Sequence, residues 1–260
     1  MRNRDDIKQI KKKYPELSNR IAEEMLILNA FEDINLCRQL LCKFKYYPNK
    51  TFKTSIKILY EDQNTLAVLK LSGVDSETGI DNKGLVNIVT NYINVKSANP
   101  FDIPRPVNRL DKDTEGIVLF SKNLEAHKYY SKLFKNHDLR KIYTAKVIGN
   151  FNLPLPYRIE TYISDKPLNR RYYSTDDRQG KKATTIVTNA VYCISDNTSD
   201  LTLEILTGKT HQIRVHLSEL GFPIVNDEIY GKKGEGKLGL KAVELQIKNC
   251  EGENILITNY

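Results

Sequence analysis

Residues 105–123, with the sequence RPVNRLDKDTEGIVLFSKN, combine a carboxylate, a tight turn and a short apolar run. Asp111 follows an arginine and a leucine, and Gly116 closes the polar turn that comes next. The apolar run 117–120 has the length and composition of a buried strand. We therefore expect Asp111 to lie on a loop beside a sheet, where catalytic groups are commonly displayed. An aspartate that only forms the turn fits this stretch equally well.

The charge of the chain points toward a polyanionic partner. The 260 residues include 40 Lys and Arg against 32 Asp and Glu, for a formal net charge of +8. Phosphate contacts from lysine and arginine dominate nucleic-acid affinity, so this excess favours RNA or DNA. A charge that serves only solubility is the alternative. The 40% hydrophobic content suits one large or two small folded domains and excludes a disordered composition.

Several functional classes lack their sequence signatures. The four cysteines form no CxxC pair and the four histidines show no HExxH spacing, so we expect no metal site. For His211 and His216 we expect ordinary hydrogen bonding. The nucleotide-binding motifs GxGxxG and the P-loop are absent. Sparse cysteine, no signal-peptide core and no apolar stretch of about eighteen residues predict a cytoplasmic chain without a membrane span.

Apolar periodicity divides the chain into two parts. Residues 1–50 repeat apolar positions at helical spacing and predict a helical N-terminal extension. Residues 51–260 predict a second, mixed domain. Its expected strands are 56–60, 66–69, 141–149, 201–205, 243–247 and 255–257, with a ribbon over 170–188 and helices after Gly84, Asn123 and Thr210. Strands and helices without a regular βαβ rhythm predict the α+β class.

Polar side chains gather in two clusters. The first is Asp111 with Arg109. The second lies at the start of a predicted helix, which we expect Thr210 to cap. It contains Lys209, Thr210, His211, Gln212 and Arg214. A helix N-terminus offers free N–H groups and a positive dipole end, so this cluster suits a phosphate or a carboxylate.

Taken in order, the motifs resemble those of the pseudouridine synthases, specifically the RluA-like branch. VNRLDKDTEGIVLFSKN resembles the catalytic stretch, KIYTAKVIG the strand with the active-site tyrosine, and LTGKTHQIRVHLSELGFPIVND the helix with the active-site arginine. ILYEDQNTLAVLKLSGV, GKKATT and GLKAVELQI are similar to the opening strand pair, the ribbon and the closing strand. The resemblance covers roughly residues 55–258. It implies an α+β pseudouridine synthase fold, a mixed, largely antiparallel bent sheet flanked by helices and loops, with a central active-site cleft.

The resemblance also implies a reaction and a set of site residues. The reaction is the isomerisation of uridine to pseudouridine in ribosomal or transfer RNA, without a cofactor or a metal. Asp111 takes the place of the nucleophile, Tyr143 that of the active-site tyrosine, and Arg214 that of the arginine paired with the aspartate. The expected substrate-binding residues are Arg109, Lys70, Thr114, Lys209, Thr210, His211 and Gln212. RNA is the expected partner of a monomeric chain.

Three departures and two alternatives accompany this interpretation. The chain has Asn108 where the branch usually has His, Leu71 where Pro is usual, and Lys241 where His is commoner. One alternative is a catalytically silent RNA-binding protein that keeps the fold, which loss of the Asp, Arg or Tyr would favour. The other is a hydrolase with paired carboxylates, Asp111 and Asp113. Asp113 is more simply a turn former.

Overall fold

The computed structural model describes residues 4–13, 22, 26, 56–77, 84–96, 104–164 and 180–260. In chain order its elements are α1 (Arg4–Lys13), β1 (Ile58–Glu61), β2 (Thr65–Lys70), α4 (Leu85–Lys96), β3 (Arg105–Pro106), β4 (Glu115–Ser121), α5 (Leu124–Asn136), β5 (Arg140–Ile148), β6 (Tyr157–Ile163), β7 (Lys181–Cys193), β8 (Thr198–Ile205), α6 (Gln212–Glu219), β9 (Leu240–Lys248) and β10 (Asn254–Thr258). Most of the predicted helical extension over residues 1–50 lies outside the described residues. So does the part of the predicted ribbon that precedes Gly180.

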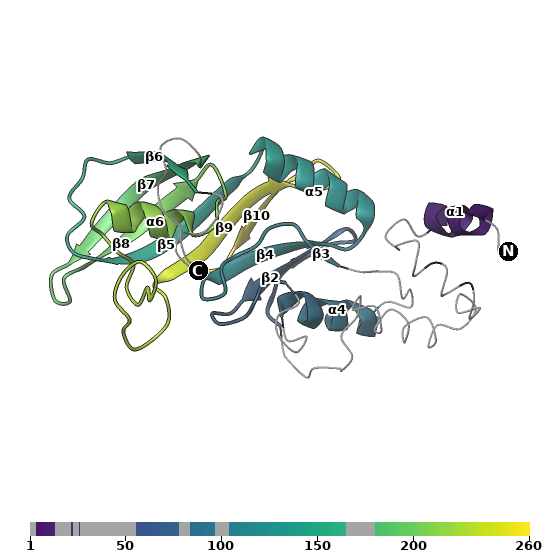
Figure 1. The fold of residues 1–260 in the computed structure, drawn as a ribbon, viewed down its shortest axis with the longest axis horizontal. Coiled ribbons are helices and arrows are strands. Elements are labelled where there is room, and N and C mark those ends of the chain that lie inside the picture. The colour runs from purple at the N-terminus through teal and green to yellow at the C-terminus, as the bar shows by residue number, and fades with distance from the viewer. Residues whose placement is uncertain are drawn as a thin grey trace.

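The strands of the described residues form one sheet that runs the length of the domain (Figure 1). Its order is β1-β2-β4-β9-β5-β8-β7-β6, with β10 added beside β9 and β3 beside β4. Neighbouring strands are antiparallel except for β4 and β9, which are parallel. The sheet is therefore mixed and largely antiparallel, and the predicted α+β class is confirmed.

A very short strand contact joins the two halves of the sheet, β1-β2-β4 and β9-β5-β8-β7-β6. β4 and β9 pair only through Glu115 with Lys241 and Gly116 with Ala242. Gly116 has a φ of 141°, and a Cβ there would lie 2.4 Å from the Ala242 carbonyl oxygen. Only glycine allows this backbone conformation and close approach together. Gly116 therefore belongs to the strand contact, and not to the turn that the sequence predicted it to close.

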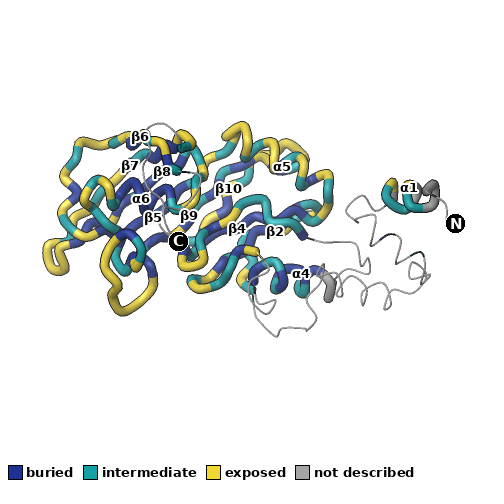
Figure 2. The backbone as a smooth tube through the Cα atoms, in the orientation of Figure 1, coloured by how far each residue is buried: buried dark blue, intermediate teal, exposed yellow. Residues whose placement is uncertain are grey.

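Alternate residues of β2 and β4 bury opposite faces of the sheet, as the period of a strand requires. Ala67, Ile117 and Leu119 pack against Ala126 and Tyr130 of α5. On the other face, Leu66, Val68, Val118 and Phe120 join Leu85, Val89 and Ile93 of α4 in a second core cluster. Figure 2 shows these strands as buried along most of their length. The sheet is therefore covered by one helix on each side in this half of the domain.

Two predicted helix starts have different outcomes. Asn123 caps α5 as predicted, because its Oδ1 accepts a hydrogen bond from the N–H of Ala126 at 2.8 Å. The prediction that Thr210 caps the next helix was wrong. α6 begins at Gln212 after His211, a left-handed residue with φ 58° whose side chain makes no capping bond. None of the helices in the described part of the chain is long and apolar enough to cross a membrane.

Candidate active site

A cavity of about 1030 Å³ opens between the two ends of the sheet. Its walls come from the loop before β4, the end of α5, strand β5 and the segment that leads into α6. Asp111, Tyr143 and Arg214 all line it, although they are far apart in the sequence. The volume is at the upper end of the range of about 300–1,000 Å³ for small-ligand sites. It has room for more than a single base.

Hydrogen bonds at two residues, Asn108 and Leu110, fix the loop that carries Asp111. The Asn108 amide donates to the carbonyl of Ile117 at 3.2 Å and accepts from the N–H of Leu119 at 2.8 Å. The Ser76 hydroxyl donates to the Leu110 carbonyl at 2.6 Å and accepts from the Leu110 N–H at 3.0 Å. Asn108, which replaces the usual His, thus ties the loop to the edge of β4.

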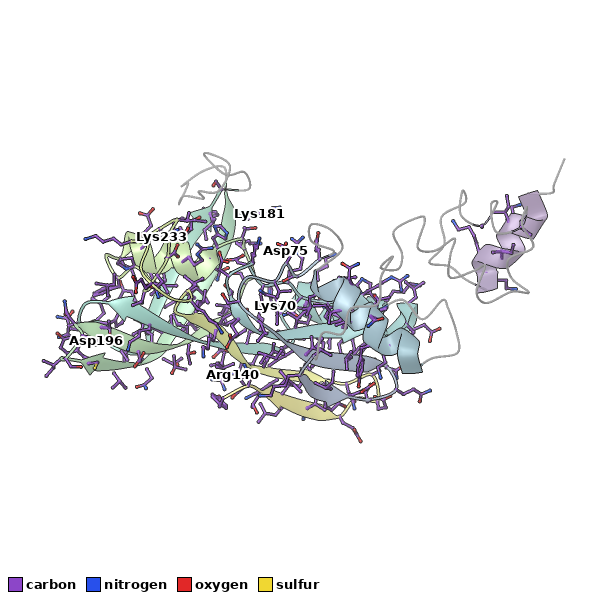
Figure 3. All side chains as sticks on the ribbon, turned by 90° about the horizontal axis from the view of Figure 1, so that it is seen from below. Lys70, Asp75, Arg140, Lys181, Asp196 and Lys233 are labelled. Carbon is purple, nitrogen blue, oxygen red and sulfur yellow. The ribbon has the colours of Figure 1, made fainter. Side chains whose placement is uncertain are left out.

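Lys70 supplies the third anchor of this loop, from inside the protein. Its Nζ donates to the carbonyls of Lys112 at 2.7 Å, Val74 at 2.8 Å and Leu71 at 3.2 Å. The side chain is fully buried, and this burial lowers the pKa of Lys70 to about 8. Figure 3 shows Lys70 near the loop that carries Asp75. The predicted substrate contact by Lys70 is therefore corrected to a structural role, because its three donors are already used.

The Asp111 carboxylate faces the cavity beside two basic side chains. Its Oδ2 lies 3.6 Å from Nη1 of Arg214 and 3.8 Å from Nε2 of His211. Neither distance is that of a hydrogen bond, and no other group of the described residues makes one with this carboxylate. The side chain is 24% exposed. Asp111 is thus held near positive charge while its oxygens stay open toward the cavity.

Arg214 is positioned by a second aspartate that sequence reasoning missed. Its Nε and Nη2 donate to the two oxygens of Asp227 at 2.8 Å and 2.7 Å, a buried bidentate pair. Asp227 also accepts from the N–H groups of Ile229 and Tyr230. Burial acts to lower the pKa of Arg214, but Asp227 and Asp111 hold it above its ordinary value. Nη1 is the part of the guanidinium left to face Asp111.

Tyr143 enters the cavity from β5 at an irregular point of the sheet. The pairing of β5 with β9 shifts register between Ile142 and Tyr143, and such a bulge re-aims a side chain. The ring is 8% exposed and lines the cavity. Burial, with a further contribution from the charge of Asp111, raises the pKa of Tyr143. The phenol is therefore protonated at neutral pH.

Six of the residues predicted to bind substrate also line the cavity: Arg109, Thr114, Lys209, Thr210, His211 and Gln212. Arg109 is exposed and forms an ion pair with Glu77 at 2.6 Å. Thr114 is buried, and within the described part of the chain its hydroxyl is the one buried side-chain polar atom without a hydrogen-bond partner. The structure therefore brings these six residues to the same cavity as Asp111.

Gln212 lines the cavity, but its amide is fully hydrogen-bonded within the protein. Its Oε1 accepts from the Thr207 hydroxyl at 2.7 Å and from the Lys209 N–H at 3.1 Å. Its Nε2 donates to the Thr184 carbonyl at 2.9 Å and to the Thr185 hydroxyl at 3.0 Å. This amide ties the segment before α6 to β7, and the substrate contact by Gln212 stays a prediction.

Both histidines of this region make hydrogen bonds. His211 bonds through Nδ1 to the Tyr230 hydroxyl at 2.9 Å. His216 is buried between the Thr185 and Thr161 hydroxyls, each at 2.9 Å. Among the described residues no group of three or more potential ligands could hold a metal ion. These contacts agree with the hydrogen-bonding role expected from the sequence.

Other cavity residues were missed, and one predicted alternative loses its geometry. Phe134, His137 and Lys141 line the cavity. Of these, only Lys141 could be found from the sequence, because it precedes Tyr143 by two residues and residues two apart in a strand share a face. Asp113 is exposed and does not line the cavity. A carboxylate pair of Asp111 and Asp113 in one site is therefore not formed.

Comparison with known proteins identifies the family of this chain. The family described as RNA pseudouridylate synthase matches residues 64–219. Over 185 residues the chain is 36% identical to ribosomal large subunit pseudouridine synthase D of Borreliella burgdorferi, covering 68% of this chain and 55% of that protein. An uncharacterized RNA pseudouridine synthase of Bacillus subtilis is 33% identical over 183 residues, covering 68% of this chain and 61% of the other. The chain thus matches little more than half the length of these relatives.

A solved structure shows the same fold. The human RNA pseudouridylate synthase domain containing 1 protein superposes with a TM-score of 0.63 at 23% identity, over 79% of this chain and 83% of that one. The fold predicted from the motifs is therefore confirmed. With the family match over residues 64–219 and this common architecture, the chain belongs to the RNA pseudouridylate synthase family.

Proposed function

We propose that this chain is an RNA pseudouridine synthase that isomerises uridine in ribosomal RNA, with Asp111 as the nucleophile and without a cofactor. Family membership supports the reaction, and the relative from Borreliella burgdorferi is named for the large ribosomal subunit. The net charge of +8 suits an RNA partner.

The open carboxylate of Asp111 is the observation that carries this proposal. A nucleophile must be ionised and must have a lone pair free for the reacting atom. Nη1 of Arg214 lies 3.6 Å from Oδ2 of Asp111, whereas Nε and Nη2 of the same guanidinium donate hydrogen bonds to Asp227. Arg214 therefore lies beside the Asp111 carboxylate without occupying its oxygens.

The reaction needs only groups that the cavity offers. The bond between N1 of uracil and C1′ of the ribose breaks, the base turns over, and a bond between C5 and C1′ forms. C5 loses a proton and N1 gains one, so no atom or electron is gained overall. Asp111 acts at the junction of ribose and base, while the walls of the cavity hold the base outside its stack. Unstacking costs a few kcal/mol, which phosphate contacts elsewhere offset.

Tyr143 is suited to the proton steps. Burial is the main cause of the raised pKa of the phenol, and the negative charge of Asp111 adds to it. The phenol therefore keeps its proton throughout and offers it to the rearranged base as a hydrogen-bond or proton donor.

The experiment begins with cells that have or lack the gene. Pseudouridines in ribosomal and transfer RNA are mapped by chemical probing in both, and we expect one or more ribosomal sites to disappear when the gene is deleted. Identical maps would contradict the proposed activity. Loss of a transfer RNA site alone would support the proposed reaction, but the substrate would then be transfer RNA and not ribosomal RNA.

Purified variants then test Asp111 against a neighbour of the same type. Asp111→Asn should abolish pseudouridine formation on a transcript of the affected RNA and keep its affinity within a few-fold. Asp113→Asn, on the same loop but outside the cavity, should turn over normally. Normal turnover by Asp111→Asn would show that Asp111 is not the nucleophile. RNA binding without turnover in the wild type would favour the silent binding protein.

A further inference from the structure

Three basic side chains from three segments meet at one part of the cavity wall. His137 ends α5, Lys141 lies on β5 and Lys209 lies in the segment before α6. α5 leads directly into β5, which places the first two on neighbouring elements (Figure 1). All three line the cavity that contains Asp111 and Tyr143. We call this set the basic wall.

The members of the basic wall are close enough to influence one another. Burial is the main cause that lowers the pKa of Lys141 to about 8, and the charge of Lys209 adds to this. Burial also lowers the pKa of His137, followed by the charges of Lys141 and Lys209. The Lys141 Nζ lies 5.9 Å from the centroid of the Phe134 ring, which forms the apolar side of this region.

The basic wall has no carboxylate to balance it, unlike other basic side chains of the same strand. On β5, Arg140 pairs with Glu204 and Lys146 pairs with Asp196, each at 3.1 Å. Within the described ranges, no carboxylate pairs with Lys141 or Lys209. The neighbouring acid Asp138 is exposed and acts on His137. Two half-buried lysines thus line the same cavity.

Two ordinary explanations cover only part of this arrangement. Cations at the end of a helix complement its dipole, which accounts for His137 at the end of α5. Solubility accounts for charges on an exposed surface. Neither explains why Lys141 and Lys209, from other elements, are both half-buried in the wall of one cavity. Such a pair is unfavourable until an anion neutralises it.

We propose that the basic wall is a phosphate subsite, which holds a phosphodiester group next to the uridine that reacts at Asp111. This proposal rests on the proposed function and names a contact of that same site. Lys141 precedes Tyr143 by two residues on one strand face, so the two side chains start about 7 Å apart. At that separation, Tyr143 lies under the base while Lys141 contacts an adjacent backbone phosphate. A contact to a phosphate does not distinguish one base from another, so its role is to position the nucleotide.

The first test uses inorganic phosphate and does not depend on activity. The lysines of the full chain are labelled with ¹³C-methyl groups, and Lys141→Gln and Lys209→Gln variants identify their NMR signals. Phosphate is then added at constant ionic strength against chloride. We expect the Lys141 and Lys209 signals to move together with one dissociation constant. Lys132, exposed on α5 and outside the cavity, is the control. No movement, or equal movement of Lys132, would overturn the subsite.

The second test assigns the phosphate to RNA. Short RNAs that contain the mapped uridine carry a neutral methylphosphonate at one flanking position at a time. In the wild type, one position should weaken binding about tenfold, the loss expected for one charge-assisted contact. The same change should cost Lys141→Gln less than twofold, whereas Lys132→Gln should lose as much as the wild type. Equal losses in all three proteins would overturn the assignment. A chain without synthase activity that still passes the phosphate test would contradict only the proposed reaction.

Discussion

At the scale of single residues, each central side chain of the site has a charged side chain close to it. Asp111 faces Arg214 without being bound by it, and Arg214 in turn is held by Asp227. Tyr143 is buried beside Asp111, which helps to keep its phenol protonated. The proposed nucleophile, Asp111, is therefore distinct from the groups that position Arg214 beside it.

The first residue-scale prediction separates the two uses of Tyr143. Tyr143→Phe keeps the ring face and loses the phenol, so it should fold and bind RNA like the wild type. We expect it to lose most of its pseudouridine formation, because the proton-bearing group is gone. Single-turnover assays beside RNA-binding and unfolding measurements check this. Full turnover would leave Tyr143 only as a platform for the base and assign proton transfer to another group.

The second residue-scale prediction concerns the buried pair of Arg214 and Asp227. Arg214→Met should lower the free energy of unfolding by about 3–5 kcal/mol, because Asp227 is left buried without its partner. Adding Asp227→Asn removes the stranded charge, so the double variant should lose less than the sum of the single losses. The exposed pair of Arg140 and Glu204 is the control, and Arg140→Met should cost less than about 1 kcal/mol. Additive losses at positions 214 and 227 would contradict the coupling.

At the scale of elements, loops and strands around the cavity are tied together by buried polar side chains. Lys70 and Ser76 fix the loop before β4, and Gln212 joins the segment before α6 to β7. His216 bonds α6 to both β6 and β7 through Thr161 and Thr185. Among these groups Lys70 and His216 titrate, and because they are shielded from water their protonation state affects how strongly the elements hold together.

His216 makes this dependence measurable. Burial lowers its pKa to about 4, below the value of about 6.5 expected in the unfolded chain. Between these two pH values the unfolded chain binds the proton more readily, so acidification favours unfolding. The stability that the neutral His216 contributes is complete above about pH 6.5 and is lost as the pH falls to about 4. The difference in pKa corresponds to about 3 kcal/mol.

Denaturant unfolding at several pH values between 4.5 and 7 tests this window. His216→Gln keeps an amide between the two threonine hydroxyls and cannot take up a proton. We expect its unfolding free energy to change clearly less with pH than that of the wild type. Equal pH dependence in the two proteins would mean that another group causes the acid sensitivity.

At the scale of the whole molecule, the net charge of +8 predicts how RNA binding responds to salt. Each phosphate contact releases condensed counterions, so the logarithm of affinity should fall linearly with the logarithm of salt concentration. We expect a slope of about −2 or steeper, equivalent to three or more phosphate contacts. Binding to the transcript of the target RNA over a range of salt concentrations measures it. A flat response would contradict an electrostatic role for the excess charge.

The sequence by itself determined most elements of the domain and the identity of its central side chains. Strands β2, β4 and β5 and helix α5 follow from local period and caps, because alternation and capping depend on residues close in the chain. The motifs around Asp111, Tyr143 and Arg214 identified the family. The catalytic roles of these three residues stay predictions.

Only the tertiary structure decided which polar groups are free to act. Lys70 and Gln212 have side chains suited to a substrate, but carbonyls and hydroxyls from distant segments use their hydrogen-bonding capacity. Asp227 becomes important only because folding brings it to Arg214, and the basic wall exists only where α5, β5 and the segment before α6 meet. A hydrogen bond or a charge contact depends on distance in space, and that distance is not a local property of the sequence.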